Sequence, residues 1–216
     1  MPLLLLDLDN TLIDRDTAFR AAAAAFLAEH ALPADDLAWL MRLDAGGYGL
    51  RDDIAAALAG RYGDAVPASA VLAFLDLGGA DRVVLAAAVR DALGEAVAAG
   101  WTCAIVTNGT VAQQERKIRR TGLDRLVHGW VISEALGCTK PAPEIFRAAA
   151  DATGAALPGA WVVGDSPHAD VRGALAIGAR SVWVSGGRAW REAAYRPTHV
   201  TAHVAPAIRH VIGQPR

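Results

Sequence analysis

The chain has 216 residues, of which 53% are hydrophobic and 20% charged, and its formal net charge is -2 at pH 7. This composition is typical of a globular protein and excludes a disordered chain, which would have less apolar content and a larger net charge. Because the net charge is close to zero, there is no global basic field that could hold a nucleic acid or an anionic membrane. An anionic ligand would have to be held by local charges.

The sequence carries no signal for secretion or membrane insertion. The apolar run near the N-terminus, Leu3–Leu6, is not preceded by basic residues, and it is far shorter than a signal peptide or the roughly 20 residues of a membrane helix. The two cysteines, Cys103 and Cys138, lack a C-x-x-C spacing and cannot form the disulfide framework of a small secreted domain. These features predict a cytoplasmic protein.

Short apolar segments alternate with helical patterns over most of the chain. This alternation predicts an α/β fold, a Rossmann-like, doubly wound parallel sheet with helices on both faces. The predicted strands are Leu3–Leu8, Thr102–Thr107, His128–Ile132, Ala160–Gly164 and Ser181–Val184, with a weaker edge strand at Thr198–His203. The predicted helices between them are Leu85–Ala99, Val111–Arg120, Glu144–Thr153 and Asp170–Ile177.

Between the first two predicted strands the pattern is helical only. The predicted helices there are Thr17–His30, Asp35–Arg42, Leu50–Arg61 and Ser69–Leu77. Since a crossover between parallel strands needs only about a dozen residues, this stretch predicts an inserted small all-helical module. The predicted domains are therefore a discontinuous core, residues 1–14 and 82–216, and a helical insert, residues 15–81.

Two aspartates follow the first predicted strand. Asp7 and Asp9 share one face because side chains alternate along a strand, and α/β sheets bind ligands at the carboxyl edge that these residues occupy. Two neighbouring carboxylates repel each other, so one ionises readily while the other is easier to protonate, unless a cation lies between them. This pair suits a nucleophile beside a general acid. Taken alone, the two residues could also be turn or capping residues.

Polar residues also follow later strands. Thr107 and Asn108 precede a helix, where a hydroxyl and backbone amides form an anion site, although an Asn-Gly pair alone is more often a turn. Lys140, fixed by the proline after it, could neutralise a phosphate and its nucleophile, although a lone lysine is usually solvated. Asp165 and Asp170 suit a hard cation such as Mg2+, although either could cap a helix. All these side chains would converge on one edge of the sheet.

In this order, the clusters resemble the pattern of the haloacid dehalogenase (HAD) superfamily: Asp-x-Asp-x-Thr, a strand ending in Thr or Ser, a lysine, and Gly-Asp-x-x-x-x-Asp. The resemblance covers nearly the whole chain and is to the phosphatase branch with a small helical cap of the C1 type. It implies an Mg2+-dependent phosphatase that acts through an aspartyl phosphate. The dehalogenase branch lacks an acid equivalent to Asp9, so Asp9 favours phosphate over halide chemistry.

The resemblance implies a role for each site residue. Asp7 would take the phosphoryl group, Asp9 would protonate the leaving group and later activate water, and Lys140 would orient Asp7. The residues implied in holding the phosphate are Thr107, Asn108 and Lys140. The residues implied at the Mg2+ site are Asp7, Asp9 through its backbone carbonyl, Asp165 and Asp170. The sequence departs from the common pattern at Asn10, Ala142 and Ala169, none of which has a direct role in this mechanism.

The helical insert corresponds to the cap of many superfamily members, which closes over the site and selects the leaving group. The candidate substrate contacts in it are Arg15, Asp16, Tyr48 and Arg51, which could instead be solvated hinge residues. The expected partner is a small phosphorylated metabolite, and the protein could be a monomer or a homodimer. Two alternatives stay open: a sugar-phosphate mutase of the same superfamily, and a non-catalytic binding protein that retains the fold.

Overall fold

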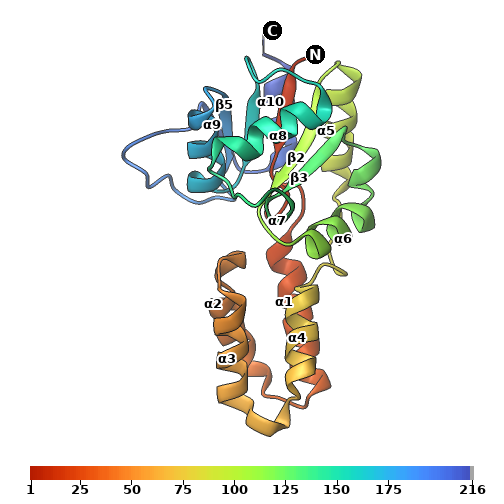
Figure 1. The fold of residues 1–216 in the computed structure, drawn as a ribbon, viewed down its shortest axis with the longest axis vertical. Helices are drawn as coiled ribbons and strands as arrows, with labels where there is room; N and C mark the ends of the chain where they lie inside the picture. Colours follow the sequence, from red (N-terminus) through yellow and green to blue (C-terminus); the bar gives the residue numbers. More distant parts are fainter. Residues whose placement is uncertain (215–216) are drawn as a thin grey trace. The chain divides into compact units, whose positions relative to one another are not determined.

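The computed structural model describes residues 1–214, and the chain divides into two compact units. One unit comprises Met1–Ile13 together with the chain from Val84 onward, and the other comprises Asp14–Val83. Figure 1 shows that the first unit contains the sheet and that the second consists of helices. Within the described residues, no helix combines the length and the apolar character that crossing a membrane requires.

The first unit is built on a six-stranded sheet with the strand order β3-β2-β1-β4-β5-β6, in which all neighbours are parallel. The strands are β1 (Leu3–Leu6), β2 (Thr102–Thr107), β3 (Gly129–Ile132), β4 (Trp161–Gly164), β5 (Arg180–Val184) and β6 (His199–Thr201). The predicted parallel α/β sheet is confirmed, including its edge strand after Thr198. Because β1 is central and covered on both faces, its sequence is four buried leucines in a row.

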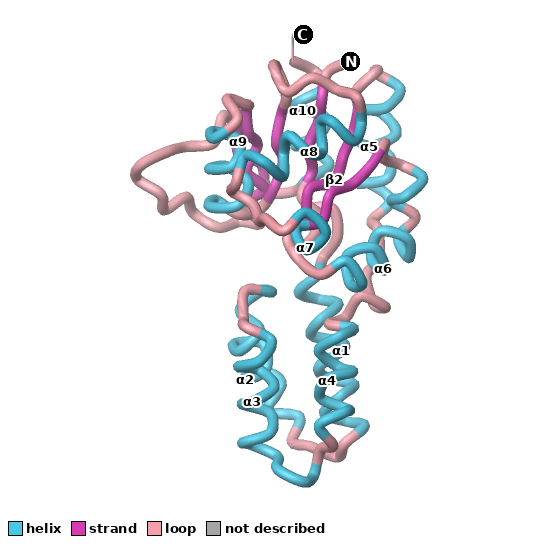
Figure 2. Tube along the Cα trace, in the orientation of Figure 1, coloured by secondary structure: helices cyan, strands magenta, loops and turns pink. Residues whose placement is uncertain are grey.

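Helices cover both faces of the sheet, with α8 and α9 on one face and α5 and α10 on the other (Figure 2). The helices of this unit are α5 (Ala87–Ala98), α6 (Val111–Thr121), α7 (Ser133–Leu136), α8 (Pro143–Thr153), α9 (Arg172–Ala176) and α10 (Val204–Ile212), with a π-helical turn at Pro167–Val171 and a 3₁₀ turn at Leu123–Arg125. Ile145 and Phe146 of α8 pack against Leu5 and Val162 of the sheet in one buried cluster. The sequence did not predict α7, which is a single turn, or α10.

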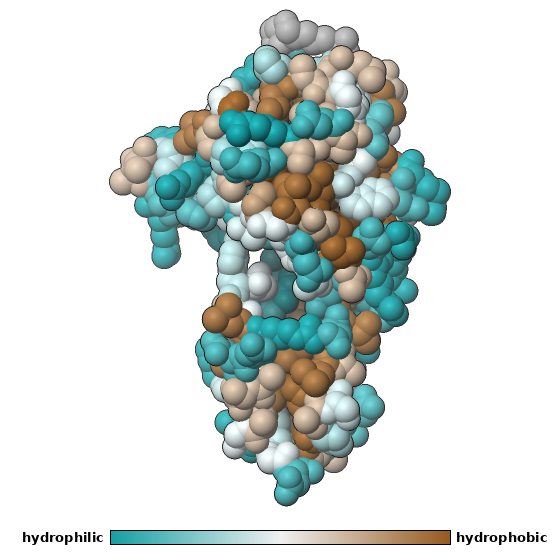
Figure 3. Space-filling model, in the orientation of Figure 1, coloured by the Kyte–Doolittle hydropathy of each residue, from teal (hydrophilic) through white to brown (hydrophobic). Residues whose placement is uncertain are grey.

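Helix α6 is amphipathic, and the surface over it is hydrophilic (Figure 3). Its buried residues are Gln114, Lys117, Ile118 and Thr121. These positions follow the i, i+3, i+4, i+7 spacing of one helix face. Three of the four are polar, so the buried face of α6 presents polar groups toward the interior of the unit.

The direction in which the chain adds strands to the sheet reverses between β1 and β4. From β1 the chain winds outward to β2 and β3, then returns across the sheet to β4 and continues to β5 and β6. In open α/β sheets, ligands bind outside the carboxyl ends of the strands at such a switch point. Asp7, directly after β1, and Asp165, directly after β4, therefore lie where the topology places a ligand.

The second unit consists of four main helices, as the sequence predicted. They are α1 (Arg15–Glu29), α2 (Leu37–Asp44), α3 (Arg51–Tyr62) and α4 (Ala68–Leu77), with 3₁₀ turns at Ala34–Asp36, Ala45–Gly47 and Gly63–Ala65. Their apolar faces meet in a core that includes Phe19, Phe26, Leu58 and Phe74. The rings of Phe26 and Phe74 stack with centroids 4.6 Å apart, which adds to the hydrophobic stabilisation of the core.

One buried carboxylate, Asp36, ties the helices of this unit together. The Nε of Arg61 donates to Asp36 Oδ2 at 2.8 Å, and the Tyr62 hydroxyl donates to the same oxygen at 2.7 Å. The Arg61 guanidinium also lies over the Trp39 ring, 4.7 Å from its centroid. Hydrogen bonds from Arg61 and then from Tyr62 lower the pKa of Asp36 below its ordinary value.

This network makes the stability of the helical unit depend on pH. A carboxyl group with a lowered folded-state pKa stabilises the fold above its unfolded pKa of about 3.9, and the stabilisation is lost as pH falls through the folded value. Asp36→Asn should therefore lower the melting temperature at pH 7, and the difference from the wild type should shrink below about pH 4. Thermal denaturation of both proteins across pH 7 to 3 checks this. The matched control is Asp35→Asn, at the exposed neighbouring position; equal melting of Asp36→Asn and wild type at pH 7 would contradict the prediction.

Candidate active site

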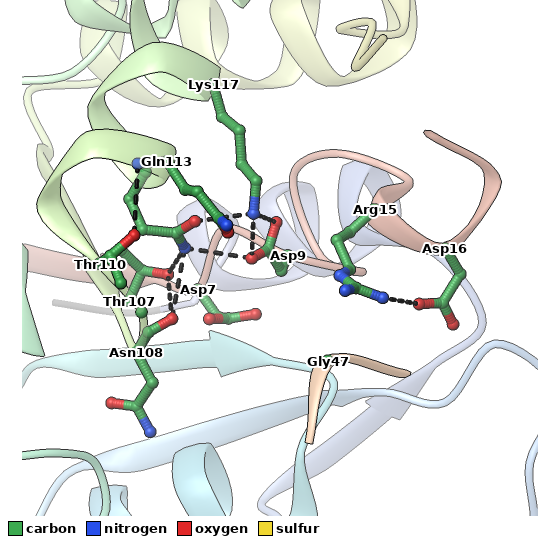
Figure 4. Close-up of polar contacts among 12 residues, drawn as sticks. Asp7, Asp9, Arg15, Asp16, Gly47, Thr107, Asn108, Thr110, Gln113 and Lys117 are labelled. Carbon is green, nitrogen blue, oxygen red and sulfur yellow. Dashed lines mark hydrogen bonds and ion pairs between the residues drawn. The ribbon is translucent and has the colours of Figure 1, made fainter. Parts of the chain in front are cut away.

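The polar residues that follow β1 and β2 lie close together at the carboxyl edge of the sheet (Figure 4). The N–H of Asp7 donates to the carbonyl of Val163 at 2.9 Å, so the ladder between β1 and β4 extends to this residue. The chain then turns sharply: Asn10 has a φ of 58°. Asparagine tolerates this left-handed conformation better than most residues, so the turn does not require a glycine here.

Lys140 connects two of the aspartates. Its Nζ donates to Asp7 Oδ1 at 2.6 Å and to Asp170 Oδ1 at 2.7 Å, and all three side chains are buried. Burial lowers the pKa of Lys140, but the charges of Asp170 and Asp7 outweigh this and raise it above the ordinary value. The ammonium is therefore charged at neutral pH and neutralises part of the acidic cluster.

The main chain of Lys140 is held by Asn108. The Asn108 Oδ1 accepts a hydrogen bond from the Lys140 N–H at 2.8 Å, and its Nδ2 donates to the Lys140 carbonyl at 3.2 Å. These two contacts fix the main chain from which the Lys140 side chain reaches the aspartates. Because its side chain is used in this way, a contact of Asn108 with a phosphate would fall to its backbone amide. The predicted phosphate-binding role of Asn108 stays a prediction.

Asp170 is fixed by a close approach to β4. Its Oδ2 accepts from the Ser166 N–H at 3.0 Å. A Cβ added to Gly164 would lie 2.2 Å from the Asp170 Cγ, so only glycine at position 164 leaves room for this carboxylate. The glycine of the Gly-Asp motif therefore has a steric function, which is to let Asp170 reach Lys140.

Among residues 1–214, one group of three or more acidic, histidine or cysteine side chains is close enough together to hold a metal ion. It consists of Asp7, Asp165 and Asp170, and one carboxylate oxygen of each lies within 4.8 Å of the others. Burial raises the pKa of Asp7 well above its ordinary value, and burial and the charge of Asp170 raise the pKa of Asp165 to about 6. Three close carboxylates with one ammonium leave excess negative charge that a divalent cation would neutralise. Oxygen-only ligands fit Mg2+ better than zinc. The donor set therefore fits the predicted Mg2+ site.

The groups that hold Asp165 were not predicted from the sequence. The Arg188 Nη2 donates to the Asp165 carbonyl at 2.8 Å and to its Oδ2 at 3.0 Å. The Trp183 indole N–H donates to the same carbonyl at 2.8 Å. Both residues come from β5 and the loop after it, where no sequence pattern pointed to the site.

The second aspartate, Asp9, lies outside the three-carboxylate cluster and contacts α6. The Lys117 Nζ donates to Asp9 Oδ1 at 2.9 Å and to Oδ2 at 2.7 Å (Figure 4). The Gln114 Nε2 donates to Asp9 Oδ2 at 3.1 Å and to the Thr107 hydroxyl at 2.5 Å. Sequence reasoning missed Lys117 and Gln114, although polar residues on the buried face of an amphipathic helix were a signal that could have been used.

The four candidate specificity residues lie in the helical unit. Arg15 is buried and forms an ion pair with Asp44 of α2, and Arg51 forms one with Asp76 of α4. Tyr48 is 72% exposed, and Asp16 accepts from Arg15 at 3.3 Å. Arg15 and Arg51 thus connect helices within their own unit. That any of the four contacts a substrate stays a prediction.

Comparison with known proteins places the chain in a family. The fold and the site define an α/β protein in which a cluster of carboxylates, partly neutralised by a lysine, lies at the carboxyl edge of a parallel sheet. A model of the haloacid dehalogenase-like hydrolases matches residues 1–178. The chain belongs to this family, and the predicted resemblance is confirmed.

Two curated relatives are phosphatases. Over 95 residues the chain is 42% identical to a phosphoserine phosphatase of Thermus thermophilus, and over 89 residues it is 34% identical to a glyceraldehyde 3-phosphate phosphatase of Pyrococcus abyssi. These matches cover 44% and 41% of this chain and span 38% and 37% of the relatives' lengths.

Two solved structures share the fold over nearly the whole chain. The magnesium-bound HAD-hydrolase YfnB of Bacillus subtilis superposes with a TM-score of 0.79 at 21% identity, covering 99% of each chain. A HAD family hydrolase of Deinococcus radiodurans superposes with a TM-score of 0.70 at 24% identity, covering 98% of this chain and 95% of the other. At these identities the likeness establishes the fold.

Removal of the Lys140 charge should destabilise the site. Lys140→Met leaves Asp7 and Asp170 buried without their counter-ion, and breaking a buried pair in this way costs about 3 kcal/mol or more. Urea denaturation without divalent cations should detect this loss in the free energy of unfolding, and added Mg2+ should restore part of it. Arg147→Met, at an exposed position of α8, is the control and should change little. A Lys140→Met protein as stable as the wild type would contradict this account of the cluster.

Proposed function

We propose that the protein is a phosphatase that hydrolyses a small phosphorylated metabolite through an aspartyl-phosphate intermediate, with Asp7 as the nucleophile. The observation that carries the proposal is the difference in hydrogen bonding between the two oxygens of the Asp7 carboxylate. Its Oδ1 is held by Lys140, whereas no side-chain or backbone group in residues 1–214 makes a hydrogen bond to its Oδ2. One oxygen is therefore fixed and the other is available to attack phosphorus.

In the first half-reaction, an oxygen of Asp7 attacks phosphorus and the bond from phosphorus to the leaving oxygen breaks. Asp9 follows Asp7 by two residues at the end of β1 and donates a proton to the leaving oxygen as general acid. The Thr107 hydroxyl and the backbone amides that follow β2 hold phosphate oxygens. Phosphoryl transfer depends mainly on positioning and charge neutralisation, and this arrangement supplies both.

In the second half-reaction, Asp9 takes a proton from water, whose oxygen attacks the phosphorus of the aspartyl phosphate. The bond between phosphorus and the Asp7 oxygen breaks, so that inorganic phosphate and a free carboxylate are formed. Lys140 stays paired with Asp7 and Asp170 throughout and offsets the negative charge at the site. Mg2+, held by Asp7, Asp165, the Asp9 backbone carbonyl and the nearby Asp170, would supply further charge neutralisation at the phosphate oxygens.

Similarity to phosphatases of phosphoserine and glyceraldehyde 3-phosphate supports a small phosphomonoester as substrate. We infer that the helical unit, Asp14–Val83, acts as the cap that selects the leaving group, with Arg15, Asp16, Tyr48 and Arg51 as its candidate substrate contacts. A sugar-phosphate mutase would return the phosphoryl group to the sugar instead of water. Analysis of the products distinguishes the two, since only a phosphatase releases stoichiometric inorganic phosphate.

The first test of the proposed function is the nucleophile. Asp7→Asn should lower phosphate release from a panel of phosphometabolites and aryl phosphates by at least about 1,000-fold, because the amide cannot form the covalent intermediate. Mass spectrometry of the wild type quenched in acid during turnover should detect a phosphoryl adduct on the peptide that contains Asp7. Asp151→Asn, at an exposed position of α8, is the matched control and should keep full activity. Turnover that survives in Asp7→Asn would overturn the assignment.

The second test concerns the cation. Phosphate release should stop when EDTA removes divalent cations and resume with Mg2+. Asp165→Asn should weaken Mg2+ binding by at least about 10-fold, since loss of even an indirect partner of a metal ligand costs that much. Isothermal titration of Mg2+ into the substrate-free protein measures this change without relying on activity. An unchanged Mg2+ affinity in Asp165→Asn would place the cation elsewhere.

A further inference from the structure

The chain contains only two lysines, Lys117 and Lys140, against nineteen arginines. Both lysines are buried, at 2% and 5% exposure, although lysine is almost never fully buried unless it is paired. Each one makes an ion pair with one of the two aspartates that follow β1: Lys140 with Asp7 and Lys117 with Asp9. The proposed mechanism uses Lys140 and leaves Lys117 without a role.

The Lys117 ammonium is fully coordinated by the protein. Its three N–H donors face three acceptors, which are both carboxylate oxygens of Asp9 and the Oε1 of Gln114 at 2.7 Å. The Lys117 side chain is 3% exposed, whereas that of Asp9 is 24% exposed. The buried lysine therefore contacts both oxygens of a carboxylate that is itself partly exposed to solvent.

Gln114 extends this contact to the predicted phosphate site. Lysine can only donate, so the Gln114 Oε1 must face Lys117 and its amide N–H groups must face Asp9 and Thr107. The Thr107 hydroxyl accepts from this amide and donates its own hydrogen to the Asn108 carbonyl at 3.4 Å. This donated bond is long, so a phosphate oxygen could replace the carbonyl as its acceptor.

This arrangement is not explained by stability. A buried ammonium loses its hydration, and replacement of a buried ion pair by apolar residues is often neutral or stabilising. The contact also joins residues 108 apart in the sequence, and it adds a charged group to the buried face of α6 beside Gln114, Ile118 and Thr121.

We propose that Lys117 is a positioning residue for the proposed reaction: together with Gln114 it fixes the Asp9 carboxylate so that it can exchange a proton with the leaving group and with water. The inference rests on the proposed phosphatase function. Lys117 touches neither the phosphate nor the leaving group, and it acts through Asp9. Replacement of Lys117 should therefore slow only those reactions that need proton transfer by Asp9.

The dependence on the leaving group tests this. 4-Nitrophenolate leaves without protonation, whereas phenolate and alkoxides need a general acid, whose contribution is about 100-fold to 10,000-fold. In single-turnover measurements with enzyme in excess, Lys117→Met should slow the release of phenol from phenyl phosphate by about 10-fold to 100-fold. It should slow the release of 4-nitrophenol by less than about 3-fold, and Lys117→Arg should recover part of the loss.

Comparison with an Asp9 variant shows whether Lys117 acts through Asp9. In an Asp9→Asn background, Lys117→Met should have almost no further effect on phenyl phosphate, because the group that it positions is already lost. Arg119→Met is the matched control, since Arg119 lies two residues further along α6 with a side chain 63% exposed, and it should leave both substrates unaffected. An equal loss for both substrates, or an equal loss in both backgrounds, would overturn the proposal.

An experiment without turnover keeps the inference separate from the proposed function. With ¹⁵N-labelled lysine the protein has only two side-chain ammonium groups, and Lys117→Met assigns them. Because its ammonium is buried and coordinated, the Lys117 signal should be protected from exchange with water, and Asp9→Asn should shift or broaden it while Asp7→Asn affects Lys140. A Lys117 signal that does not respond to Asp9→Asn overturns the proposal. If the wild type shows no turnover but its Lys117 signal still responds to Asp9→Asn, the result counts against the proposed function and not against the contact of Lys117 with Asp9.

Discussion

The contact of Lys140 with Asp7 and Asp170 is the interaction on which the site depends. Without a positive charge, the carboxylates of Asp7, Asp165 and Asp170 could not all stay ionised so close together, since Asp7 and Asp170 are also buried. Lys140 is itself tolerated in the interior only because two carboxylates surround it. The lysine and the acidic cluster therefore require each other, and together they leave the excess of negative charge that suits a divalent cation.

The fold brings these groups together by the order of its strands. Asp7 and Asp165 end neighbouring strands, β1 and β4, although more than 150 residues separate them in the sequence. Lys140 lies on a loop whose main chain exchanges two hydrogen bonds with the Asn108 side chain, which follows β2. Asp7 and Asp165 are thus attached to neighbouring strand ends of one sheet, and Lys140 is anchored to the end of a third strand, β2, through Asn108.

The sequence predicted what depends on local pattern and missed what depends on long-range contacts. Apolar runs and the polar residues after them located β1, β2 and β4 and the aspartates at their ends, since both signals lie within a few residues. Gln114 and Lys117 were missed because their partner, Asp9, lies 105 and 108 residues away in the sequence. Arg188 was missed for the same reason, because its contact with Asp165 depends on how the loop after β5 folds back.

The choice of lysine over arginine at the site follows from what a reacting carboxylate has to do. At some purely structural contacts this chain uses an arginine that binds both carboxylate oxygens at once, as Arg209 does with Glu95 at 2.8 Å and 2.8 Å. A planar guanidinium favours this two-point contact. At Asp7 it would occupy the oxygen that has to attack phosphorus, whereas the compact ammonium of Lys140 neutralises the charge through one oxygen and leaves the other accessible. In a chain so rich in arginine, a lysine at this position is what the proposed nucleophile requires.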